Sequence, residues 1–92
     1  MQTKQAVKVE RMYTLNGEGP TRAFCDLLLM DTFVVKGLRV IQGKDNLFLG
    51  FPRNQGKDGK WYETFFPVAK DTRKGLEEFV LDEYRTRTGA GS

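Results

Sequence analysis

The chain has 92 residues, with 15 Lys and Arg against 12 Asp and Glu, no His and a single Cys. This length indicates one domain with a thin hydrophobic core, which a partner subunit would help to stabilise. The longest apolar run covers residues 27–30, far short of the about 20 residues that a membrane helix needs. The first residues lack the pattern of a signal peptide, and one Cys cannot form an internal disulfide. We therefore expect a soluble, cytoplasmic protein without a membrane partner.

The composition also argues against an enzyme. His is the commonest acid–base catalyst and metal ligand near neutral pH, and a structural zinc site needs four nitrogen or sulfur ligands. The chain has neither those ligands nor a phosphate-binding GxxxxGK[ST] or GxGxxG motif. Cys25 lies in an alternating apolar run without a candidate base, which favours a buried structural thiol over a nucleophile. We therefore expect no catalytic residue, cofactor, metal or small-molecule substrate.

Five β-strands are predicted in the first two thirds of the chain. Residues 7–15 alternate in polarity, and the side chains expected on one face are Val7, Val9, Tyr13 and Leu15. Turn-forming residues then separate apolar runs that we interpret as strands over 23–30, 33–42, 47–51 and 60–66, with a polar loop over 52–59. Because the connections are short, the strands are expected to pair as an antiparallel meander.

An amphipathic helix is predicted after Pro67, with Asp71 or Thr72 as its N-cap. Apolar residues recur within 72–87 at the three- and four-residue spacing of a helix stripe: Leu76, Phe79, Val80 and Tyr84. The predicted fold class is therefore α+β, an antiparallel β-meander of about five strands followed by a C-terminal amphipathic helix. We expect a single domain over residues 1–88 and a flexible tail over 89–92.

The third predicted strand is apolar on both faces. Strict alternation places Val34, Leu38 and Val40 on one face and, on the other, Phe33, Val35 and Ile41. One helix covers only one face of a sheet, and an exposed apolar patch usually marks an interface. Homodimerisation is the favoured interpretation, and the alternative is that the loops fold over the second face.

The positive charge is concentrated in the middle of the chain. Residues 1–35 carry no net charge, residues 36–60 carry six cations and two anions for a net +4, and residues 61–92 carry −1. Within the middle block, Arg53, Lys57 and Lys60 share the predicted loop with the amides of Asn54 and Gln55. This mixture can contact phosphates and base edges, although exposed lysines in a loop are also ordinary surface residues.

Two further cations, Arg73 and Lys74, are expected in the first turn of the helix, where the helix dipole favours anions. Beside free backbone N–H groups they would form a phosphate site, and the alternative is that Asp71 and solvent screen both charges. A phosphate clamp made of loop and helix start predicts that Ala at either position weakens binding. Folding would be nearly unchanged or slightly improved, because a cation leaves the positive end of the helix.

Trp61 and Tyr62 follow Lys60 directly and alternate between the faces of the predicted strand, so one of them should be exposed beside the basic loop. A core position for Trp61 is the favoured interpretation, because large aromatic residues contribute strongly to a thin core. The alternative is that Trp61 stacks on a nucleic-acid base, as in single-strand binders.

Three segments resemble the SpoVG family, the stage V sporulation protein G or septation regulators of bacteria. They are DTFVVKGLRVIQGKDNLFLGFP, KDGKWYETFFPV and DTRKGLEEFVLDEY. The resemblance extends over about residues 7–85. The chain departs from the family pattern at Phe66, where a His is usual, and at Asn54 and Gln55, where the family's loop is more basic.

The resemblance implies a small cytoplasmic homodimer that binds DNA, and in some cases RNA, and regulates sporulation, septation or other gene expression. Family members bind through the loop before the fifth strand and the region of the C-terminal helix. The corresponding residues here are Arg53, Lys57, Lys60, Arg73 and Lys74. The alternative function is a protein-interaction adaptor without nucleic-acid binding, in which the apolar second sheet face or an edge strand recruits another protein.

Overall fold

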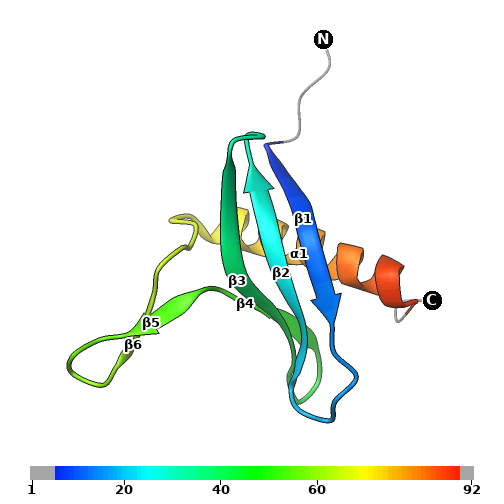
Figure 1. Cartoon of the computed structure of the whole chain (residues 1–92), viewed down its shortest axis with the longest axis horizontal. Coiled ribbons are helices and arrows are strands. Elements are labelled where there is room, and N and C mark those ends of the chain that lie inside the picture. The colour runs from blue at the N-terminus through cyan, green and yellow to red at the C-terminus, as the bar shows by residue number, and fades with distance from the viewer. Residues whose placement is uncertain (1–5, 90–92) are drawn as a thin grey trace.

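The computed structural model describes residues 6–89 (Figure 1). Four strands form one antiparallel sheet in chain order, two more form a separate hairpin, and one helix follows. The elements are β1 (Val7–Thr14), β2 (Thr21–Leu29), β3 (Phe33–Gln42), β4 (Leu47–Gly50), β5 (Arg53–Gln55), β6 (Trp61–Glu63) and α1 (Lys70–Thr88). The predicted α+β class, with sequential antiparallel strands before a C-terminal helix, is confirmed.

The predicted fifth strand is wrong in its extent and in its sheet. Within residues 60–66, β6 covers only Trp61–Glu63, and its partner is β5, inside the segment predicted to be a loop. Pro52 has no backbone N–H to donate to a ladder, so pairing in the main sheet ends before it. The chain leaves the sheet at this point, and the β5–β6 hairpin projects from the body of the molecule (Figure 1).

A β-bulge at Gly37 changes which side chains of β3 share a face. The pairing shifts between Cys25–Leu38 and Leu27–Val35, and Gly37 has a φ of +98°. Strict alternation predicted Val35 and Leu38 on opposite faces. The prediction is wrong because the extra residue places both side chains against the core.

A second bulge lies between Val9 and Arg11, and it changes which side chains of β1 face the core. Met12 packs against the core together with Val9, whereas Tyr13 is exposed on the other face. Period-two alternation predicts Tyr13 on the same face as Val9, and one inserted residue reverses that assignment.

The core lies between one face of the four-stranded sheet and α1, which crosses behind the strands (Figure 1). The predicted helix stripe is confirmed, because Val80 is buried and Leu76, Phe79 and Tyr84 pack against the core. The sheet contributes Ala23, Cys25, Leu27, Leu38, Val40 and Leu49. Burial raises the pKa of the Cys25 thiol to about 11, as expected for the predicted structural role.

The helix α1 begins earlier than predicted. Its N-cap is Ala69, which has no side-chain capping bond, so neither Asp71 nor Thr72 is the cap. Asp71 lies in the first turn, where an acidic side chain suits the helix dipole. Arg73 and Lys74 are consequently the fourth and fifth residues of the helix rather than its first.

The C-terminal end of α1 has a glycine cap. Gly89 has a φ of +73° and donates its N–H to the Arg85 carbonyl at 2.7 Å. The remainder of the predicted flexible tail, residues 90–92, lies outside the described residues. In the part of the chain that the structure describes, no helix is long and apolar enough to cross a membrane.

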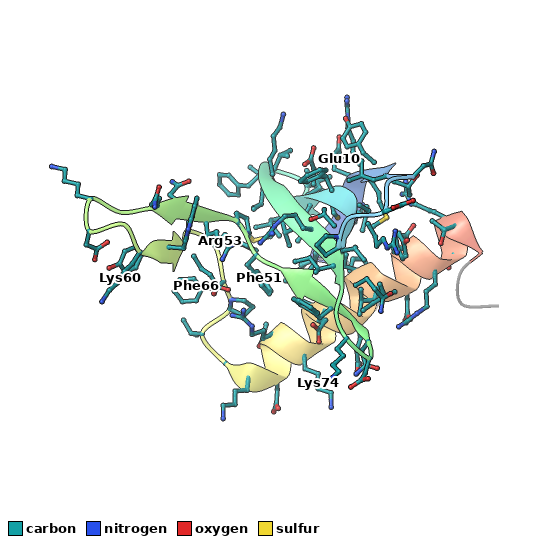
Figure 2. All side chains as sticks on the ribbon, turned by 90° about the horizontal axis from the view of Figure 1, so that it is seen from below. Glu10, Phe51, Arg53, Lys60, Phe66 and Lys74 are labelled. Carbon is teal, nitrogen blue, oxygen red and sulfur yellow. The ribbon has the colours of Figure 1, made fainter. Side chains whose placement is uncertain are left out.

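The sheet face opposite α1 is uncovered in the described chain, and Figure 2 shows Glu10 on this side. We call it the open face and define it by four exposed apolar residues, one from each strand: Tyr13, Phe24, Val34 and Phe48. The prediction that apolar side chains lie on both faces of the sheet is therefore confirmed, with Val34 rather than Val35 on the uncovered side.

Candidate nucleic-acid interface

The tip of the β5–β6 hairpin is a defined turn. Gly56 donates its N–H to the Lys60 carbonyl at 2.7 Å, and Gly59, with a φ of +84°, closes a three-residue loop. Asp58 accepts a hydrogen bond from the Tyr62 hydroxyl at 2.5 Å and another from the Lys60 N–H at 2.9 Å. These two bonds lower the pKa of the Asp58 carboxyl, so at neutral pH it is ionised and can accept both of them.

Three predicted site residues, Arg53, Lys57 and Lys60, lie on this hairpin, with Arg53 at its base and Lys60 near its tip (Figure 2). All three are exposed. Within residues 6–89 none of them forms an ion pair with a carboxylate. We call residues 53–63 the basic hairpin.

Trp61 is 55% exposed, so the interpretation of this residue as part of the core is wrong. The hairpin pairs only with itself and projects from the main sheet (Figure 1). The indole is therefore left largely uncovered. The Arg53 guanidinium lies 5.1 Å from the indole ring centroid, a cation–π distance. Tyr62 is exposed as well, because neither face of the hairpin packs on a second layer.

A pocket of about 390 Å³ lies between β3 and the base of the basic hairpin. Its lining includes three cations, Lys36, Arg39 and Arg53, together with Trp61. No carboxylate of the described chain forms an ion pair with any of the three. Partial burial and the charge of Arg53 lower the pKa of the Arg39 guanidinium. This basic pocket therefore concentrates positive charge and favours an anionic ligand.

Glycines on two neighbouring strands shape the basic pocket. Gly50 pairs with Arg39 across β3 and β4, and a Cβ at position 50 would lie 2.9 Å from Nη2 of Arg39. The missing side chain lets the guanidinium lie over the β4 backbone. Gly37 lines the same pocket, and its bulge sets the alternation of the β3 residues on either side of it.

Arg73 joins α1 to the basic hairpin. Its guanidinium donates to both carboxylate oxygens of Glu63, at 3.1 and 2.8 Å, and lies 4.4 Å from the Phe51 ring centroid. These bonds lower the pKa of the Glu63 carboxyl. The Arg73 backbone N–H donates to the Ala69 carbonyl at 3.0 Å, so it is not one of the free donors of the helix start.

Lys74 lies apart from the other predicted site residues. It projects from the side of α1 that faces away from the sheet, whereas Arg53 and Lys60 lie on the hairpin (Figure 2). The structure therefore places three predicted cations on one element, connects Arg73 to the base of that element, and leaves Lys74 on another surface.

Two residues of the basic pocket, Lys36 and Arg39, are missing from the predicted site. Both belong to the block 36–60 that carries a net charge of +4. This concentration of charge is the sequence feature that could have indicated them as site residues. They share a pocket with the hairpin only because of the turn that the chain makes after β4, which no local pattern encodes.

The sequence of this chain matches a known protein family. The sequence model of the SpoVG family matches residues 3–86. The chain belongs to the SpoVG family. A protein of Archaeoglobus fulgidus named "Putative septation protein SpoVG" is 33% identical over 75 residues, which are 82% of this chain and 88% of that protein.

Two further relatives have similar coverage. "Putative septation protein SpoVG 2" of Listeria monocytogenes serotype 4b is 36% identical over 74 residues, 80% of this chain and 72% of its own length. A relative in Oceanobacillus iheyensis is 36% identical over 75 residues, 82% and 78% of the two chains. The SpoVG match includes the basic hairpin and the basic pocket, and the resemblance noted in the sequence is confirmed. The relatives are named for septation rather than for an enzyme activity.

Proposed function

We propose that this SpoVG-family chain is a homodimeric regulator that binds DNA or RNA and acts on septation, sporulation or other gene expression. One observation carries the proposal: cations without ion-pair partners in the described chain gather on the basic hairpin and around the basic pocket. They are Lys36, Arg39, Arg53, Lys57 and Lys60. Nucleic acid is the polymer whose closely spaced phosphates match such a surface.

The predicted residues have different roles in this proposal. Arg53, Lys57 and Lys60 neutralise phosphates along the hairpin. Glu63 lies opposite Arg53 in the β5–β6 strand pairing. Arg73 neutralises the Glu63 carboxylate and so keeps that surface positive. Lys74 reaches a phosphate only if the nucleic acid also passes the far side of α1, which makes it the weakest member of the set.

The homodimer is supported by the open face. Phe24 is 41% exposed although it lies in a central strand, between Tyr13 of β1 and Arg39 of β3. Apolar side chains in the middle of a sheet are seldom left in solvent, because burying them contributes about 25 cal/mol per Å². A second copy of the chain would cover this face and present the basic hairpin twice.

The test is a fluorescence-polarisation titration of labelled DNA and RNA at two salt concentrations. We expect affinity to fall steeply with salt, because bound phosphates release their counterions. Ala at Arg53, Lys57 or Lys60 should weaken binding similarly across sequences. Each replacement should reduce the slope of log affinity against log salt by about one.

Lys44→Ala is the matched control, because it removes one cation from the same charged block in the β3–β4 turn, away from the hairpin. Its salt slope should equal that of the unmodified chain. Equal slopes for Lys44→Ala and the hairpin variants would mean that the hairpin has no special role.

A second surface favours the adaptor function, and it differs from the sheet face and the edge strand through which that function was predicted. An apolar pocket of about 460 Å³ lies between the start of α1 and the neighbouring ends of β1 and β2. Its lining includes Leu29, Phe66, Leu76 and Phe79. The adaptor becomes the better description if the titration detects no DNA or RNA binding at low salt.

A further inference from the structure

The basic pocket has the dimensions of a small-ligand site. Its volume of about 390 Å³ lies within the roughly 300–1,000 Å³ of pockets that enclose small molecules. Its walls come from the β3 bulge on one side and from the hairpin on the other: Lys36, Gly37, Arg39, Pro52, Arg53 and Trp61. A double helix is too wide for such a pocket, whereas one unpaired nucleotide fits its scale.

One wall of the pocket is an aromatic surface. Trp61 lines the pocket and is 55% exposed, with the Arg53 guanidinium over its ring at 5.1 Å from the centroid. A base inside a duplex already has its faces stacked on its neighbours, so an indole can stack only on a base that is unpaired and free to turn outward. The aromatic wall therefore favours a single strand.

The other walls supply charge for the phosphates on either side of that base. Arg39 and Arg53 are near enough for the charge of Arg53 to lower the pKa of Arg39, and Lys36 adds a third cation. Glu63, the carboxylate of the hairpin beside Arg53, is already bound to Arg73 at 2.8 Å. The pocket thus combines a stacking surface with three cations that form no ion pair among the described residues.

We infer that the basic pocket is a subsite for one unpaired nucleotide, with the base stacked on Trp61 and the adjoining phosphates contacted by Lys36, Arg39 and Arg53. The inference rests on the proposed nucleic-acid binding and deepens it, because it selects single-stranded DNA or RNA over duplex. Stacking on an aromatic side chain tolerates any base, so the subsite distinguishes single strands from duplex and does not select a base sequence.

The test compares strands with and without bases. The probes are oligothymidylate, oligouridylate, an abasic strand and a duplex, each roughly twelve units long, which is within the site size of single-strand binders. The unmodified chain should bind the two base-bearing strands about fivefold to a hundredfold more tightly than the abasic strand. Its only tryptophan should also change fluorescence with these strands.

Trp61→Ala should lower the affinity for base-bearing strands to the abasic level and leave abasic binding unchanged. Unchanged abasic binding also demonstrates that the variant is folded. Trp61→Phe should keep part of the affinity, because a smaller ring still stacks. Phe66→Ala is the control, since Phe66 is 51% exposed and lines the apolar pocket instead. It should bind all probes like the unmodified chain.

Two results would overturn the subsite while nucleic-acid binding stands. One is equal affinity of the unmodified chain for abasic and base-bearing strands, and the other is a Trp61→Ala loss of the same factor on every probe. Binding of no probe at low salt would overturn both the subsite and the proposed function. Oligodeoxyuridylate, which differs from oligouridylate only in lacking the 2′-hydroxyl, distinguishes DNA from RNA as the natural ligand.

Discussion

At the scale of single residues, Arg73 has a different role from the one its position in the sequence predicts. It was expected to contact phosphate from the helix start, but its guanidinium is bound to both oxygens of Glu63 and lies over Phe51. Glu63 lies opposite Arg53 in the strand pairing of the hairpin, so a carboxylate without a partner at this position would oppose phosphate binding. Arg73 therefore acts as a positioning residue that neutralises Glu63 and attaches the hairpin to α1.

A double-mutant cycle of Arg73→Ala and Glu63→Gln, each alone and both together, tests this role. Arg73→Ala should weaken nucleic-acid binding, because it leaves Glu63 negatively charged beside Arg53. Adding Glu63→Gln should restore binding, since the local charge returns to that of the unmodified chain. Affinities are measured at low salt, where the screening of such charges is smallest. If Arg73 contacted phosphate directly, Arg73→Ala would weaken binding by the same factor in the Glu63→Gln background.

Stability provides a second readout of the same residue. Arg73→Ala should lower the free energy of unfolding by about 1 kcal/mol, because it removes a bidentate ion pair and a cation–π contact at a partly exposed site. This is opposite to the small gain expected from the helix dipole alone. Urea unfolding of Arg73→Ala and Lys74→Ala separates the two effects, since Lys74 has no ion-pair partner among the described residues.

At the scale of secondary-structure elements, the bulge in β3 decides which residues face the core and which face the basic pocket. Gly37 supplies the positive φ of +98° that the bulge requires, and most other residues reach such a conformation only with strain. A Cβ at Gly37 would lie 3.5 Å from Cβ of Pro52, an ordinary van der Waals distance. The constraint at this position is therefore backbone conformation rather than space.

Replacing Gly37 and Gly75 by Ala should change stability in opposite directions. Gly37→Ala should lower the free energy of unfolding by about 1–3 kcal/mol through backbone strain. Gly75→Ala should raise it by about 0.5–1 kcal/mol, because Gly75 lies within α1 and a Cβ there meets open space. Urea titration of both variants checks the prediction. If Gly37→Ala left the free energy of unfolding unchanged, a side chain at this position would not strain the bulge.

At the scale of the whole molecule, the thin core and the uncovered sheet face have the same origin. One helix covers one face of the four-stranded sheet, and the hairpin projects sideways instead of folding over the other face (Figure 1). The open face therefore carries exposed aromatic residues from adjacent strands. A homodimer through this face is the arrangement that would bury them.

Phe24→Glu should convert the dimer to a monomer. Sedimentation of the unmodified chain at micromolar concentration should give about twice the chain mass of 10.5 kDa, and the variant should give the single mass. Far-ultraviolet circular dichroism should be unchanged, because Phe24 is outside the core of one subunit. Val68→Glu is the control, since Val68 is 98% exposed in the link before α1. A single mass for the unmodified chain would contradict the proposed dimer.

Much of the fold could be predicted because its signals are local. The stripe from Leu76 to Tyr84 is repeated within one helix, and the strand boundaries follow turn residues such as Gly43 and Asn46, whose backbones are hydrogen-bonded at 2.8 Å. The faces of β1 and β3 could not be predicted, because one inserted residue reverses an alternation of period two. The exposure of Trp61 was missed because the strand assigned to the sheet pairs only with β5.

The sequence by itself determined the α+β class, the family resemblance, the buried Cys25 and the positive block from residue 36 to 60. These properties depend on composition and on the spacing of residues close together in the chain, and both can be read directly from the linear sequence. Tertiary structure alone decided that Arg39 and Arg53 line one pocket and that Arg73 is bound to Glu63. Those contacts join different elements, and their geometry depends on where the chain turns after β4 and on the ion pair that holds the base of the hairpin to α1.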